Sequence, residues 1–132
     1  MAPHRLEKWQ PLPPTEHNRF CVFCQDLEAD PLVLFHASPK RHFDAIATSG
    51  FRSAAALGHG ELTSVSYAKN SSSCLAHIGN PVPEDYVVLA VRFDTLALKG
   101  IVENTSDIHV YDAALQPRIL GYCELPKGFR VS

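Results

Sequence analysis

The chain has 132 residues, of which 45% are apolar and 20% are charged, and it carries a formal net charge of −2. These values are typical of one globular domain and exclude a chain-wide basic field that would attract nucleic acid or an anionic membrane. No apolar run reaches the roughly 18 residues that a membrane-spanning helix needs, so we expect a protein that makes no use of the membrane.

Residues 1–30 are expected to form an N-terminal extension. The prolines within residues 1–14 predict an extended lead-in, because proline cannot continue a helix. Thr15 is a candidate helix cap, and the apolar spacing that follows predicts a short helix over residues 16–27. The lead-in lacks the apolar core of a secretory signal, so we expect a cytoplasmic protein, or one delivered into the cytosol of a target cell.

The cysteines and histidines do not predict a metal site. Cys21 and Cys24 form a C-x-x-C pair, but a zinc site needs further ligands at a similar spacing, and the sequence offers no second pair. His42, His59 and His109 are not spaced as metal ligands on one helix either. We therefore expect free thiols and no bound metal.

The central part of the chain begins with a strand and a helix. Leu-Val-Leu-Phe at residues 32–35 predicts a buried strand, which delivers His36 at its end. A helix is expected to follow and to end at Gly50, which suits a left-handed C-terminal position. Residues 51–60 are rich in alanine and glycine, and they predict a loop.

The remaining sequence predicts strands around one further helix. The strands are expected at residues 62–68, 86–93, 108–111 and 118–125. The serines at residues 71–73 predict the start of the helix between the first two of these strands. This order predicts an α+β domain over residues 31–126, followed by a tail at residues 127–132.

Segments in three regions of the chain stand out together. They read Leu-Phe-His-Ala-Ser at 34–38 with Gly-Phe at 50–51, Ser-Val-Ser-Tyr-Ala at 64–68 before a helix, and Asp-Ile-His-Val-Tyr-Asp at 107–112 before Gln-Pro-Arg-Ile-Leu at 116–120. In this order they resemble the motifs of ADP-ribosyltransferases of the diphtheria-toxin and poly(ADP-ribose) polymerase type. The resemblance covers about residues 32–125. It implies a compact ADP-ribosyltransferase-like fold, with split antiparallel or mixed sheets and a few short helices around an NAD-binding cleft.

The implied chemistry explains why such residue types occur together. Breaking the bond between nicotinamide and ribose creates positive charge on the sugar, so the enzyme must orient the ribose and place negative charge beside it. By resemblance, His36 hydrogen-bonds a ribose hydroxyl, the backbone of Ala37 pairs with the nicotinamide carboxamide, and Ser38 contacts the adenosine side. The family has glycine where this chain has Ala37, which requires slightly more room near the ligand.

The resemblance also implies flat side chains against the nicotinamide ring. Two registers stay open: one matches Ser66 with His77 and leaves Tyr67 in the core, and the other matches Tyr67. We favour Tyr67 and His77 as the ring contacts, because a bulge at a strand edge shifts the register by one residue. Ser66 is kept among the NAD-binding residues. Ser73 or Cys74 is expected to offer the polar contact that the family places one turn before its second aromatic residue.

Asp107 matches the acidic residue of the family's last motif. By resemblance, its carboxylate binds the ribose 2′-hydroxyl and stabilises the sugar cation. Aspartate is one methylene shorter than the family's usual glutamate, and the nearby Glu103 is a rival for the same role. The expected catalytic residues are therefore His36, Tyr67 and Asp107.

The favoured function is transfer of a single ADP-ribose unit from the co-substrate NAD+ to a protein or nucleic-acid acceptor, with release of nicotinamide. The chain is too short for the regulatory helical domain of the polymerases and is closer in size to the toxins and effectors that the resemblance includes. Two alternatives stay open. One is a non-catalytic module of the same fold that binds NAD+, ADP-ribose or a protein. The other is an NAD-dependent RNA 2′-phosphotransferase, which needs arginines such as Arg41 and Arg52 for the RNA phosphate.

Overall fold

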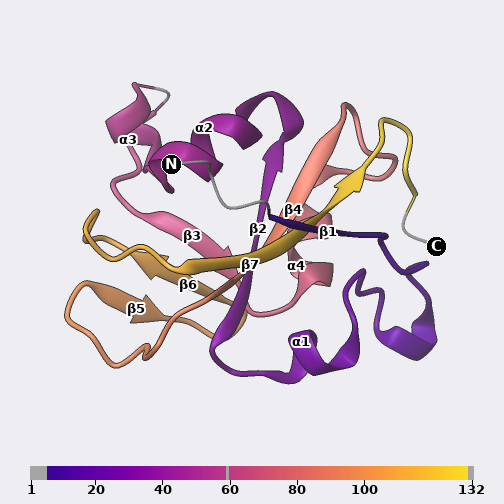
Figure 1. Ribbon diagram of the computed structural model, residues 1–132, viewed down its shortest axis with the longest axis horizontal. Coiled ribbons are helices and arrows are strands. Elements are labelled where there is room, and N and C mark those ends of the chain that lie inside the picture. Colours follow the sequence, from indigo (N-terminus) through magenta and orange to yellow (C-terminus); the bar gives the residue numbers. More distant parts are fainter. Residues whose placement is uncertain (1–5, 59, 131–132) are drawn as a thin grey trace.

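An antiparallel pair of strands, β2 (Val33–Pro39) and β4 (Tyr86–Arg92), forms the centre of the molecule (Figure 1). The computed structural model describes residues 6–58 and 60–130, and within them seven strands form one mixed sheet in the order β1-β7-β4-β2-β3-β6-β5. The middle of β4 is buried throughout, which explains why its sequence is a continuous apolar run instead of an alternating one. The predicted α+β class is confirmed.

The outer strands extend the sheet on both sides of this pair. Their bounds are Glu7–Trp9 for β1, Arg118–Leu125 for β7, Val65–Ala68 for β3, Asp107–Val110 for β6 and Ile101–Glu103 for β5. Strand β1 runs parallel to β7, and the other pairs are antiparallel. The sequence predicted β3, β4, β6 and β7, whereas β1 and β5 are each only three residues long and gave no recognisable pattern.

The sheet is split on one side of β2. Among the described residues, β2 pairs with β3 at a single position, where Phe35 lies opposite Ala68. Beyond this rung the two strands separate, and Figure 1 shows β3 running away from β2 at a steep angle. Strand β3 then pairs along its whole length with β6. The opening between β2 and β3 is where the candidate site lies.

Two apolar clusters fill the two faces of the sheet. One face carries α4 (Ser71–Ile78) and the buried side chains of Val22 and Phe23 from the N-terminal segment. The other face carries Phe51 and Tyr67, with side chains of α2 (Phe43–Ser49) packed against them. Burial on both faces of β2 and β4 supplies the main favourable contribution to folding.

The N-terminal segment belongs to the same sheet and core. The continuous helix predicted over residues 16–27 is wrong, because the chain forms a 3-10 turn at Glu16–Asn18 and a separate helix, α1, at Gln25–Ala29. Arg19 and Phe20 lie between them with left-handed φ angles of 56° and 61°, which interrupt a right-handed helix.

The helices of the central part match the sequence more closely. A 3-10 turn, η2 (Lys40–His42), leads into α2, and Gly50 ends that helix at a φ of 82°, as predicted. The loop predicted over residues 51–60 contains one short helix, α3 (Ala54–Leu57), capped by Ser53. None of the helices in the described ranges is both long enough and apolar enough to cross a bilayer.

Candidate functional site

A cavity of about 390 Å³ opens beside the split between β2 and β3. Its size lies within the range of small-molecule sites, and its walls combine apolar surface with a few converging polar groups. The polar side chains among its described lining residues are those of His36, Ser66, Ser73, His77, Tyr86, Ser106 and Asp107. They come from β2, β3, α4, the start of β4, and the turn into β6 with its first residue, so the cavity exists only because these elements meet.

His36 stands where the β2–β3 ladder would otherwise continue. Its Nδ1 lies 2.8 Å from the backbone carbonyl of Ser66, and because a carbonyl oxygen only accepts, Nδ1 carries the proton. In the neutral ring, Nε2 is then a hydrogen-bond acceptor. Burial lowers the pKa of His36, and the hydrogen bond to Ser66 opposes that shift, so the neutral form is favoured at pH 7.

Aromatic packing fixes the plane of the His36 ring. The ring meets Phe51 edge-on, at a centroid distance of 5.0 Å, and it lies 5.6 Å from Tyr67. Phe51 is itself held by Gln116, whose amide accepts from the Phe51 N–H at 2.8 Å and donates to its carbonyl at 2.9 Å. Gln116 belongs to the last of the sequence motifs, so two distant motifs combine to orient His36.

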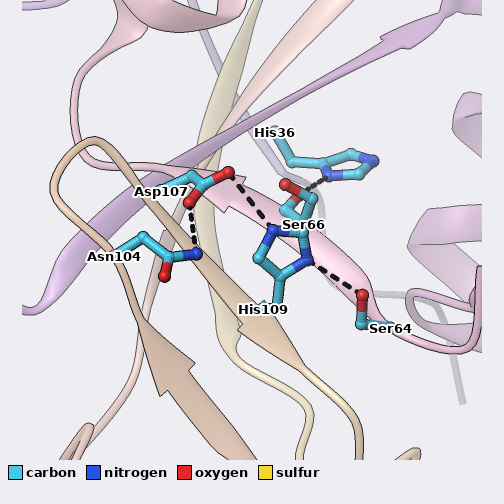
Figure 2. A network of polar contacts seen from close by, with 6 residues as sticks. All are labelled: His36, Ser64, Ser66, Asn104, Asp107 and His109. Atoms are coloured by element: carbon cyan, nitrogen blue, oxygen red, sulfur yellow. Dashed lines mark hydrogen bonds and ion pairs between the residues drawn. The ribbon is translucent and has the colours of Figure 1, made fainter.

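Asp107 opens β6 and contributes a carboxylate to the cavity wall. Asn104 donates to its Oδ1 at 2.8 Å, and Nε2 of His109 lies 3.2 Å from its Oδ2 (Figure 2). The hydrogen bond from Asn104 is the main cause that lowers the pKa of Asp107, with smaller contributions from His109 and His77. Among the described residues that line this cavity, Asp107 carries the only carboxylate, so the site has a fixed negative charge at neutral pH.

Helix α4 supplies the wall opposite β6. Its cap, Asn70, accepts from the Ser73 N–H and from the Ser73 hydroxyl, both at 3.0 Å, so the hydroxyl oxygen of Ser73 retains acceptor capacity. Cys74 is buried, and burial raises the pKa of its thiol to about 12, which keeps it neutral. The backbone of Ala37 faces that thiol. His77 is exposed at the edge of the cavity.

The structure separates Tyr67 from the cavity. Its side chain is 1% exposed and packs with Phe51 and Phe93 on the opposite face of the sheet. The expectation that Tyr67 contacts the nicotinamide ring is therefore corrected, because side chains alternate along a strand and the preceding residue, Ser66, faces the cavity. Of the two registers left open by the sequence, the geometry agrees with the one that matches Ser66 with His77.

Ser38 lies in a second cavity, of about 260 Å³, on the α2 side of β2. His36 lines both cavities, and Arg52 reaches the second one. The Ser38 side chain is buried, with its hydroxyl directed toward the Pro39 carbonyl at 3.4 Å.

Two other candidates from the sequence, Glu103 and Arg41, do not line the cavity that contains Asp107. Glu103 forms an ion pair with Lys69 at 2.7 Å and does not line the cavity. Arg41 forms an ion pair with Glu84 on the exposed surface, so it does not join Arg52 in one phosphate-binding group. The geometry thus favours Asp107 as the acidic residue and gives little support to an RNA phosphate site.

The cysteines and the polar side chains around Asp107 are not arranged for metal binding or for hydrolysis by a serine nucleophile in the part of the chain that the structure describes. All four cysteines are unpaired, and residues 6–58 and 60–130 contain no group of three or more potential ligand side chains arranged for a metal. His59 lies outside the described residues. Ser64, His109 and Asp107 are the residue types of a hydrolase triad, but Ser64 is buried and the carboxylate faces the cavity instead. This arrangement orients the Asp107 carboxylate toward the cavity and does not present Ser64 as a nucleophile.

The sequence did not reveal the roles of the residues that support the site. Ser64 and Gln116 lie within the quoted motifs, but their partners are 45 and 65 residues away in the sequence, whereas Asn104 contacts Asp107 three residues on. His109 was considered only as a metal ligand. The one available signal was that His109 follows Asp107 by two residues on a strand, which puts both side chains on the same face.

The chain matches no protein-family model, and no curated protein or solved structure matches it.

Proposed function

We propose that this chain is an ADP-ribosyltransferase that binds NAD+ in the cavity between β2, β3, α4 and β6 and transfers its ADP-ribose to a protein or nucleic acid. One observation carries the proposal: His36, Ser66, Ser73, His77 and Asp107, which the sequence assigned to NAD+ from three separate motifs, all line the same cavity. A chance resemblance in the sequence gives no reason for such residues to converge.

His36 orients the ribose in this proposal. The proton on Nδ1 is committed to the Ser66 carbonyl, so Nε2 accepts a hydrogen bond from a ribose hydroxyl. The fixed plane of the ring, between Phe51 and Tyr67, reduces the entropy lost when the sugar binds. The ribose thus lies beside His36 in the cavity that contains Asp107.

The nicotinamide end binds against α4. Ser73 accepts from the carboxamide nitrogen, the Ala37 backbone completes that contact, and the His77 imidazole lies against the ring. Cys74 adds apolar surface, since its thiol is neutral and buried. This assignment uses the Ser66–His77 register and gives Tyr67 a structural role behind His36.

Asp107 acts on the reacting bond. When the C1′–N bond breaks, the electron pair leaves with nicotinamide and positive charge develops on the ribose. The Asp107 carboxylate accepts from the 2′-hydroxyl and stabilises that charge in a partly enclosed site, where electrostatic interactions are stronger than in water. An oxygen or nitrogen atom of the acceptor then bonds to C1′ and loses its proton.

Nicotinamide release and transfer of label from NAD+ test the proposal. The protein is incubated with labelled NAD+ and a cell lysate, and the modified molecule is identified by mass spectrometry. Asp107→Asn keeps the shape of the side chain but removes its charge, and it should lower turnover by about 100-fold or more. Glu103→Gln is the matched control and should keep turnover near that of the wild type, because Glu103 is paired with Lys69.

Each alternative gives a different result in the same assays. A rise in melting temperature with NAD+, without nicotinamide release, identifies a binding module. Activity on RNA that carries an internal 2′-phosphate identifies a phosphotransferase. Loss of activity in Glu103→Gln but not in Asp107→Asn would contradict the role given to Asp107.

A further inference from the structure

A chain of polar side chains runs from Asp107 into the protein (Figure 2). Behind the carboxylate lies the His109 imidazole, with Nε2 3.2 Å from Oδ2 of Asp107. The other ring nitrogen, Nδ1, is 2.9 Å from the hydroxyl of Ser64. Ser64 is 6% exposed, and neither Ser64 nor His109 lines the cavity that contains Asp107. The two residues therefore act on a ligand only through Asp107.

The donor and acceptor groups of this polar network determine which of its atoms carry protons. A carboxylate only accepts, so Nε2 of His109 carries a proton and donates to Asp107. In the neutral ring, Nδ1 is then an acceptor, and the Ser64 hydroxyl donates to it. Both ring nitrogens of His109 are thus engaged, which fixes the imidazole behind the Asp107 carboxylate.

Other groups around His109 do not replace this contact. Its cross-strand neighbours in the ladders are Ser66 on β3 and Val102 on β5, neither of which carries a charge. The Tyr111 ring lies nearly parallel to the imidazole, at a centroid distance of 6.3 Å. The nearby charges are those of Lys69 and Glu103, which pair with each other, and of His77, which acts on Asp107 across the cavity.

We propose that His109 is a positioning residue that holds the Asp107 carboxylate toward the cavity. The proposal rests on the proposed function, because it assigns Asp107 to the sugar cation. It adds a residue outside the cavity wall on which the placement of that carboxylate depends.

The first test measures the contact without any NAD+. The carbon-13 signal of the Asp107 carboxyl is titrated by NMR in the full chain and in His109→Leu and His109→Gln. The leucine variant should shift the Asp107 titration midpoint to higher pH, and the glutamine variant, whose amide donates in place of Nε2, should shift it less. An unchanged midpoint in His109→Leu would overturn the positioning role, whether or not the chain turns over NAD+.

The second test measures the steady-state kinetics of nicotinamide release. His109→Leu should lower kcat by about 10- to 100-fold, the range seen when an outer partner of a site residue is removed, with little change in KM. His109→Gln should restore most of kcat, because its amide donates to Asp107 in place of Nε2. A wild-type kcat in His109→Leu, or a change confined to KM, would overturn the positioning role.

His17→Gln is the matched control and should leave the Asp107 midpoint and kcat near those of the wild type, because His17 is exposed and does not line the cavity. If even the wild-type protein releases no nicotinamide, the proposed function fails, and the NMR titration still decides whether His109 holds Asp107.

Discussion

Strand β2 meets the rest of the sheet in two different ways. Toward β4 it pairs along its whole length, and its partners from Val87 to Val91 are buried aliphatic residues. Toward β3, within the part of the chain that the structure describes, it keeps one rung, and the side chain of His36 takes the Ser66 carbonyl where the ladder would continue. The closed side contributes burial, and the open side exposes polar groups to a cavity. One strand thus supports folding along one edge and ligand recognition along the other.

The largest effect on stability is expected on the closed side. Leu89 lies opposite His36 in the β2–β4 ladder and is 0% exposed. Leu89→Ala should lower the free energy of unfolding by about 3 kcal/mol, because it removes buried methyl groups and leaves a cavity. Urea denaturation followed by the fluorescence of Trp9, which packs against Phe23, measures the loss.

Leu62→Ala is the control for this prediction. Leu62 is 65% exposed, so its truncation should change the free energy of unfolding by no more than about 0.5 kcal/mol. Equal losses in the two variants would show that the β2–β4 side is not the main source of stability.

A smaller effect on the free energy of unfolding is expected from His36, and it is seen only when the pH is changed. Its pKa is lowered in the folded state, mainly by burial, so the unfolded chain binds a proton first as the pH falls below about 6.5. The free energy of unfolding therefore decreases as the pH falls through this range, by at most about 1.4 kcal/mol per pH unit for one proton. His36→Gln should reduce that slope, as measured by urea denaturation at about pH 7.5, 6.5 and 5.5, which cover the range in which histidines titrate.

His77→Gln serves as the comparison for the pH prediction, because His77 is exposed and lies at the edge of the same cavity. The slope in this variant should stay near that of the wild type. A slope that changes in His77→Gln and not in His36→Gln would contradict the role given to His36 in the pH dependence of stability.

The smallest effect is expected at Ser66. Its backbone carbonyl holds His36, whereas its side chain faces the cavity and is exposed. Ser66→Ala should therefore leave the free energy of unfolding within about 0.5 kcal/mol of the wild type, as measured by urea denaturation. A loss of more than about 1 kcal/mol, typical of a broken buried hydrogen bond, would show that the open side also supports the fold.

Local patterns in the sequence were sufficient for most of the elements around the site. The apolar runs at β2 and β4, the serines that begin α4 and the glycine that ends α2 are each explained by short-range preferences. The N-terminal helix was predicted as continuous because apolar spacing does not reveal the left-handed backbone at Arg19 and Phe20. The three-residue strands β1 and β5 depend on pairing with their neighbours, so their own residues carry no clear signal.

The residues of the candidate site likewise divide into those that the sequence predicted and those that only the structure identified. The resemblance in the sequence pointed to His36 and Asp107 within its motifs and to Ser73 and His77 on the helix after the second motif, so these candidates came from the sequence by itself. Only the tertiary structure decided that Ser66, and not its neighbour Tyr67, faces the cavity, because a shift of one residue moves a side chain to the other face of a sheet. It also decided that Ser64 meets His109 behind Asp107, since a hydrogen bond between residues 45 positions apart depends on register and packing that no single segment encodes, whereas Asn104 and His109 lie within three residues of Asp107.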